Sequence, residues 1–286
     1  MDKKTAIEES LVEMGNGEEA IELTRDNLGI FGISTKGEVT IPEFIEYDGQ
    51  TYPIGIIGDC AFSECYELTK INIPRSVTRI GMYAFYRCHS LESVIMSDNV
   101  ESIYDFAFSF CSALSRITIP NGVTEIYDCT FEGCKALEFV TLPEDLQRIG
   151  QAAFMGCLSL EDIEIPDDVH VIADEAFNEC PKLRRVVFPT MLQEIGDLAF
   201  QGAPIEMVEF YETLRHIGCY AFADCTELTE VNIPYDIDKI SDFAFSGCTG
   251  LKKVTVPYGM KIRKAVFLGC TSLNMKKDKC VEKKGE

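Results

Sequence analysis

A phenylalanine recurs along this chain at a nearly constant interval, and that recurrence limits the folds open to it. The steps between successive members are 23 residues, apart from two steps of 22. A fixed period of this length is the signature of a repeat protein, whose units stack because one unit alone buries too little apolar surface. The series is Phe62, Phe85, Phe108, Phe131, Phe154, Phe177, Phe200, Phe222, Phe245 and Phe267.

Other residue types keep step with the phenylalanines. An isoleucine lies five positions before each of them, from Ile57 to Ile262, and a leucine lies six positions after most of them. An apolar-x-apolar-Pro step then follows, as in Ile71-Asn-Ile73-Pro74. A cysteine lies three positions after the phenylalanine in every repeat but the seventh, which has Ala203. The cysteine series is Cys65, Cys88, Cys111, Cys134, Cys157, Cys180, Cys225, Cys248 and Cys270.

The spacing within one repeat predicts its local structure. Residues Ile57, Ala61, Phe62, Cys65 and Leu68 are mostly three or four apart, which places them on one face of a short helical turn. The alternating pair Ile71 and Ile73 predicts a strand with both side chains on one side, and Pro74 ends it. We therefore expect a strand, a turn, a short extended piece and a helical turn in each repeat.

These columns closely resemble the BspA-type (Treponema pallidum-type) leucine-rich repeat family over roughly Ile54 to Leu273. The match has the form Leu-x-x-Ile-x-Ile-Pro-x-x-Val-x-x-Ile-Gly-x-x-Ala-Phe-x-x-Cys. The resemblance implies a leucine-rich-repeat solenoid, a right-handed curved α/β coil. A parallel β-sheet would line its concave side and short helical turns its convex side. It also implies an adhesive protein of host-associated bacteria.

We expect three segments along the chain. Residues 1–53 would form an N-terminal cap, residues 54–273 about ten repeats of 22–23 residues, and residues 274–286 a polar, Lys-rich tail. Within the cap, Asp48-Gly49 is a hairpin turn signal, and the first 14 residues fit a short amphipathic helix. Short strands are predicted at Ile21–Leu23, Leu28–Ile33 and Val39–Ile41. The seventh repeat, shortened around Ala203-Pro204-Ile205 with Tyr211 in place of the proline, predicts a local irregularity.

The formal net charge of −21 argues against a nucleic-acid partner, because displacing counterions from phosphates requires a cationic surface. No apolar run is long enough to span a membrane, so membrane insertion is not expected. Localisation stays open: the resemblance favours the cell surface or secretion, whereas the polar start of the chain lacks a signal peptide and favours the cytoplasm.

The 13 cysteines favour neither disulfides nor metal sites. Side chains in a ladder lie parallel, whereas a disulfide needs converging Cβ vectors, and no Cys-x2-Cys pair occurs. Buried thiols acting as small apolar residues are the expected alternative. The three histidines, His89, His170 and His216, fall at different repeat positions, and no catalytic motif is present. We therefore expect a non-enzymatic protein with no cofactor and no metal.

Candidate binding residues are those that the repeat pattern places outside. Alternation along the predicted strands turns two columns of side chains outward, one through Arg116 and one through Ile95. Apolar or arginine residues at these positions, together with two tyrosines after a proline, are the predicted contacts: Ile95, Arg116, Phe139, Arg185, Val187, Met207, Tyr235 and Tyr258. The expected function is protein–protein or protein–glycan recognition by a monomer. The alternative is an intracellular scaffold or regulatory binding protein.

Overall fold

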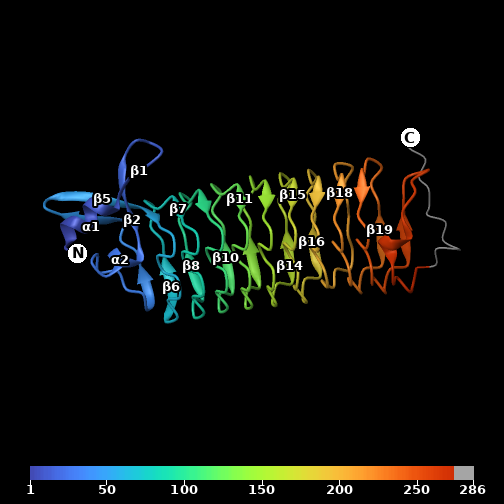
Figure 1. Ribbon diagram of the computed structural model, residues 1–286, viewed down its shortest axis with the longest axis horizontal. Coiled ribbons are helices and arrows are strands. Elements are labelled where there is room, and N and C mark those ends of the chain that lie inside the picture. Colours follow the sequence, from blue (N-terminus) through green and yellow to red (C-terminus); the bar gives the residue numbers. More distant parts are fainter. Residues whose placement is uncertain (274–286) are drawn as a thin grey trace. The chain divides into compact units, whose positions relative to one another are not determined.

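The computed structural model describes residues 1–273, so the predicted tail lies outside the described residues. The chain divides into two compact units, Met1–Pro143 and Glu144–Glu286. In each unit every repeat makes one turn of a coil, and successive coils lie side by side (Figure 1). This is the predicted leucine-rich-repeat solenoid with parallel strands. Among residues 1–273, no helix is long and apolar enough to cross a membrane.

The N-terminal unit begins with elements outside the repeat pattern. Helix α1 (Lys3–Ser10) is shorter than expected and starts where the Asp2 carboxylate accepts the amide of Thr5, at 2.9 Å. A strand predicted over Leu28–Ile33 is wrong, since helix α2 (Arg25–Leu28) and turns occupy this stretch. The Asp48-Gly49 hairpin is present, with both residues at positive φ. The strands are β1 (Leu11–Glu13), β2 (Glu19–Leu23), β3 (Gly37–Thr40), β4 (Phe44–Tyr47) and β5 (Gln50–Ile57).

Most repeats contribute two short strands, which form two rows. The first row holds the strands that precede the proline position. In the N-terminal unit these are β6 (Leu68–Asn72), β8 (Ser93–Ile95), β10 (Arg116–Thr118) and β12 (Phe139–Thr141). In the C-terminal unit they are β14 (Asp162–Glu164), β16 (Arg185–Val187), β19 (Glu230–Asn232) and β21 (Lys253–Thr255). Figure 1 shows β6, β8 and β10 along one side of their unit and β7 along the other.

The second row holds two-residue strands that end on the repeating isoleucine. In the N-terminal unit they are β7 (Arg79–Ile80), β9 (Ser102–Ile103) and β11 (Glu125–Ile126). In the C-terminal unit they are β13 (Arg148–Ile149), β15 (Val171–Ile172), β17 (Glu194–Ile195), β18 (His216–Ile217) and β20 (Lys239–Ile240). The repeating isoleucine therefore belongs to the expected extended piece and not to the helical turn.

The segment around each phenylalanine is a run of tight turns, not an α-helix. Amides donate to carbonyls three residues back, as in Cys65 to Phe62 at 3.1 Å, and the last repeat forms the 3-10 helix η1 (Lys264–Phe267). Alternate amides donate instead to the following coil, as in Phe62 to the carbonyl of Ala84 at 2.7 Å. Backbone hydrogen bonds thus join neighbouring coils in the turns as well as in the strands.

The phenylalanines form the centre of the core in both units. All are buried, and neighbouring rings stack almost parallel, with centroids 5.0 Å apart for Phe85 and Phe108 and 5.3 Å apart for Phe154 and Phe177. Each cysteine next to this ladder does more than fill space. The thiol of Cys111 donates to the carbonyl of Phe85 in the preceding coil, at 3.2 Å, and Cys134 contacts Phe108 likewise. The thiol satisfies a carbonyl that would otherwise lie buried without a partner.

The seventh repeat is irregular, as predicted. Residues 203–211 form no strand, and the buried Ala203 takes the place of the cysteine. Phe210 stands where other repeats have a small aliphatic residue, and its ring lies 5.7 Å from that of Phe222. Phe188 contacts both Phe200 and Phe210. Extra aromatic packing therefore fills the space left by the shorter chain.

Two positions in each regular repeat, two residues before and two residues after the phenylalanine, adopt left-handed backbone conformations. Glycine occupies the second position in only some repeats, and Glu179, at φ 57°, occupies it in another. At Gly202, φ is 73°, and a Cβ atom there would meet nothing within 4 Å.

Gly202→Ala isolates the cost of the left-handed backbone, because the added methyl group has open space around it. We expect the free energy of unfolding to fall by about 1–2 kcal/mol in urea denaturation. Gly29→Ala is the matched control, since Gly29 also has open space but a φ of −65°. Equal stability of the two variants would contradict the backbone assignment.

Alkaline pH should weaken the fold through the buried thiols. Burial raises the pKa of Cys134 to about 12, above its ordinary value of 9.0. The folded chain therefore keeps a proton that the unfolded chain loses, and stability falls between these two values by about 1.4 kcal/mol per pH unit for each such thiol. Urea denaturation of wild type and Cys134→Ala at about pH 8 and about pH 10 should show the smaller loss in the variant. Equal losses would contradict this prediction.

Candidate functional site

The N-terminal unit brings two of the predicted contact residues together on the first strand row. Arg116 of β10 and Phe139 of β12 are register partners in neighbouring parallel strands. Both side chains are exposed, and 60% of Phe139 is accessible. The guanidinium carbon of Arg116 lies 5.8 Å from the centroid of the Phe139 ring, a cation–π arrangement. Strand register alone therefore builds a paired aromatic and cationic contact on the surface.

Ile95 lies in the same strand row but in the other outward column. Its register partner in β6 is Asn72, and 52% of its surface is accessible. Its carbonyl accepts the amide of Ile73 at 2.8 Å, which fixes the backbone beneath the exposed side chain. Ile95 therefore presents an apolar side chain at a fixed place, although no direct contact joins it to Arg116 and Phe139 in strand register.

In the C-terminal unit Arg185 is occupied by an ion pair. Its Nε and Nη2 atoms donate to the two carboxylate oxygens of Asp162, at 2.7 and 2.5 Å, and the two residues are register partners. These hydrogen bonds hold the pKa of Asp162 below its ordinary value. A ligand would therefore meet a planar, charge-balanced pair at this position and not an isolated cation.

Val187 and Met207 are the exposed apolar residues of that unit on this side. Val187 lies two residues after Arg185 on β16, so both point outward. Met207 belongs to the irregular seventh repeat, where no strand forms, and 71% of it is accessible. The strand pattern thus placed both residues correctly on the outside, even where the strand itself is lost.

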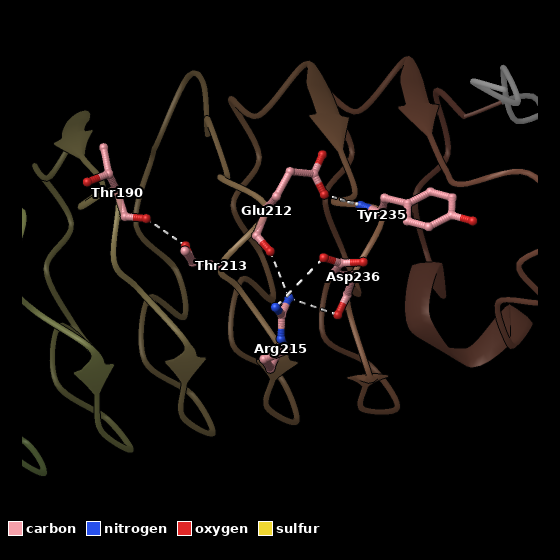
Figure 2. A network of polar contacts seen from close by, with 6 residues as sticks. All are labelled: Thr190, Glu212, Thr213, Arg215, Tyr235 and Asp236. Atoms are coloured by element: carbon pink, nitrogen blue, oxygen red, sulfur yellow. Dashed lines mark hydrogen bonds and ion pairs between the residues drawn. The ribbon is translucent and has the colours of Figure 1, made fainter. Parts of the chain in front are cut away.

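The two tyrosines lie elsewhere, on the turns that follow the first-row strands. Tyr235 and Tyr258 are each 63% accessible and occupy equivalent positions in adjacent coils, because β19 and β21 pair in register. The backbone amide of Tyr235 donates to Oε2 of Glu212 in the preceding coil at 2.6 Å (Figure 2). These tyrosines therefore form a surface separate from the strand columns.

One polar arrangement was missed because the sequence places its members in three different repeats. His216 of β18 lies with Nδ1 3.5 Å from a carboxylate oxygen of Glu194 and Nε2 3.2 Å from Oγ of Ser241. Glutamate, histidine and serine in this order match the members of a hydrolytic triad. Ser241 is only 4% accessible, however, so a substrate cannot reach its hydroxyl. The arrangement instead ties three neighbouring coils together.

Aromatic pairs on the turns were also missed. Tyr83 and Phe106 stack with ring centroids 4.6 Å apart, and Tyr66 stacks on His89 at 5.6 Å. Their signal was available in the sequence, since both pairs are separated by one repeat of 23 residues. The surface interpretation of His89 was correct, but its ring contact requires the coil register.

The acidic residues around repeats four to six have structural partners. Asp167 accepts the amide of Thr190 at 3.0 Å, and Asp174 accepts the amide of Asp197 at 2.7 Å. Carboxylates at these turns thus satisfy donors of the next coil. Within the part of the chain that the structure describes, no three His, Cys, Asp or Glu side chains are close enough to hold a metal ion.

Comparison with solved structures supports the fold. The Treponema pallidum leucine-rich repeat protein is 24% identical, with a TM-score of 0.58, and the match covers 76% of this chain and 86% of that one. A leucine-rich repeat protein from Bacteroides ovatus is 26% identical, with a TM-score of 0.48 and coverages of 83% and 89%. A leucine-rich cell surface protein from Faecalibacterium prausnitzii is 27% identical, with a TM-score of 0.41 and coverages of 92% and 91%.

No curated protein sequence matches this chain. The family model for the BspA-type leucine-rich repeat region matches residues 51–161 and 147–274, which is well over half of the sequence. Repeat proteins of this kind are recognition modules, generally without catalytic activity. By its repeats and by its coiled parallel strands, the chain belongs to the BspA-type leucine-rich repeat family.

Proposed function

We propose that this chain recognises another protein through the outward side chains of its first strand row. The observation that carries the proposal is the Arg116–Phe139 pair, in which an exposed aromatic ring and a guanidinium group lie in contact on adjacent strands. Aromatic and arginine residues carry a large share of the binding energy in protein interfaces. Leaving such a ring in water has a solvation cost that a partner would remove.

The scaffold beneath this pair favours tight recognition. The strand positions are fixed by hydrogen bonds to the neighbouring coil, for example from Ile119 to the carbonyl of Thr141 at 2.9 Å. The ring and the guanidinium also restrict each other. Little conformational entropy therefore remains to be lost on binding, and pre-organisation of this kind raises affinity.

The exposed residues of the C-terminal unit provide a second set of contacts of the same type. Val187 and Met207 are apolar and largely accessible, and the Arg185–Asp162 pair beside Val187 offers directed hydrogen-bonding groups. Apolar contacts next to a charge-balanced pair suit a protein surface. The net charge of −21 makes a nucleic acid an unsuitable partner for either set.

Phe139→Ser tests this proposal. Peptides selected on the full-length chain from a short-peptide display library should bind wild type at least about tenfold more tightly than Phe139→Ser, measured by isothermal titration calorimetry. Arg116→Gln should weaken binding in the same direction, because it removes the cationic partner of the ring.

The matched control is Phe44→Ser. Phe44 is also an exposed phenylalanine of the N-terminal unit, but it lies on β4, outside the first strand row. We expect this variant to bind within about twofold of wild type. If all selected peptides bound the Phe139 and Phe44 variants equally well, the strand row would not be the recognition surface.

A further inference from the structure

The turns that follow the first-row strands in the C-terminal unit carry a second exposed feature, formed by Tyr235 and Tyr258. Each ring is 63% accessible, and each tyrosine follows a proline that fixes the direction of the turn. No ring contact involves either tyrosine within residues 1–273. Their aromatic faces are therefore available to a ligand, unlike those of the stacked pairs on other turns.

The turn that carries Tyr235 is held by a network of polar contacts from three successive coils (Figure 2). Glu212 accepts the amide of Tyr235, and Nη1 of Arg215 donates to the carbonyls of Glu212 and Asp236, at 2.7 and 3.1 Å. The hydroxyl of Thr213 donates to the carbonyl of Thr190 at 2.6 Å. The backbone under the ring is thus fixed before any ligand arrives.

The side chain of Tyr235 itself points away from this network. Figure 2 shows its ring directed away from Glu212, with the phenolic oxygen at the far end. One carboxylate oxygen of Glu212 is engaged by the Tyr235 amide, and the other is directed outward in the same view. Asp236 is held more loosely, with an oxygen 3.8 Å from Nη2 of Arg215. A rigid aromatic ring therefore has hydrogen-bond acceptors close by.

We propose that Tyr235 and Tyr258 form a binding platform for a neutral, linear glycan. The apolar C–H face of a pyranose ring packs on an aromatic face, and sugar hydroxyls donate hydrogen bonds to carboxylates. Adjacent coils are about 4.8 Å apart, a spacing comparable with one sugar unit of an extended glycan. Equivalent tyrosines on neighbouring coils can therefore stack on successive sugars of one chain.

The charges around the platform select among glycans. Glu212 and Asp236 flank Tyr235, and the single cation between them, Arg215, is already engaged by Glu212 and Asp236. Sulfated and uronic-acid glycans would meet negative potential at this surface, on a chain with a net charge of −21. This site is distinct from the strand row proposed above, and each can fail while the other holds.

Calorimetry with defined oligosaccharides tests the platform on the full chain. The probes are neutral hexasaccharides of β1,4-linked glucose, mannose or N-acetylglucosamine, the matching disaccharides, and a heparin hexasaccharide. At least one neutral hexasaccharide should bind, and more tightly than its disaccharide. Tyr235→Ser and Tyr258→Ser should each weaken it about tenfold, whereas Tyr235→Phe should keep affinity within about threefold because the stacking face remains.

The controls separate this site from the rest of the surface. Tyr66→Ser removes a tyrosine of similar exposure from the N-terminal unit, and Phe139→Ser disrupts the strand row, so both should leave glycan affinity unchanged. Thermal unfolding of each variant verifies that it folds. The proposal is overturned if no neutral hexasaccharide binds, if both tyrosine-to-serine variants bind like wild type, or if the heparin probe binds more tightly.

Discussion

The structure depends on the exact register between neighbouring coils, and hydrogen bonds enforce that register around the whole circuit of each repeat. Strands pair in parallel in two rows, and the turns between them donate amides to the next coil as the strands do, for example from Phe85 to Ala107 at 2.7 Å. Identical residues then stack on one another. The phenylalanine ladder and the thiol hydrogen bonds both follow from this register, because each needs its partner one coil away.

The same register determines what the surface can do. A side chain that points outward has its neighbours one repeat away at a nearly fixed distance, so pairs form across coils wherever the sequence supplies complementary groups. Arg116 meets Phe139 in this way, and Arg185 meets Asp162. Because the backbone does not need to adapt, a substitution at one outward position changes a contact without changing the coil. Recognition and stability are therefore carried by different columns of the repeat.

Much of the scaffold could be predicted from the sequence, because the period is printed in it. The buried ladder, the strand before the proline and the outward position of Met207 all follow from alternation and spacing. The cap was harder, since Leu28–Ile33 is apolar enough for a strand but forms a helix end and turns. The left-handed positions were also hidden, because residues such as Glu179 occupy them and only some repeats reveal them with glycine.

The candidate sites divide along the same line. That Phe139, Tyr235 and Tyr258 are exposed could be predicted, because exposure depends on the position within one repeat. What each residue contacts could not, because a contact joins two repeats through side-chain conformations that spacing does not specify. His216 illustrates the difference: its neighbours Glu194 and Ser241 come from two other coils. In a solenoid the chemistry of a site therefore arises between repeats, where a single repeat gives no sign of it.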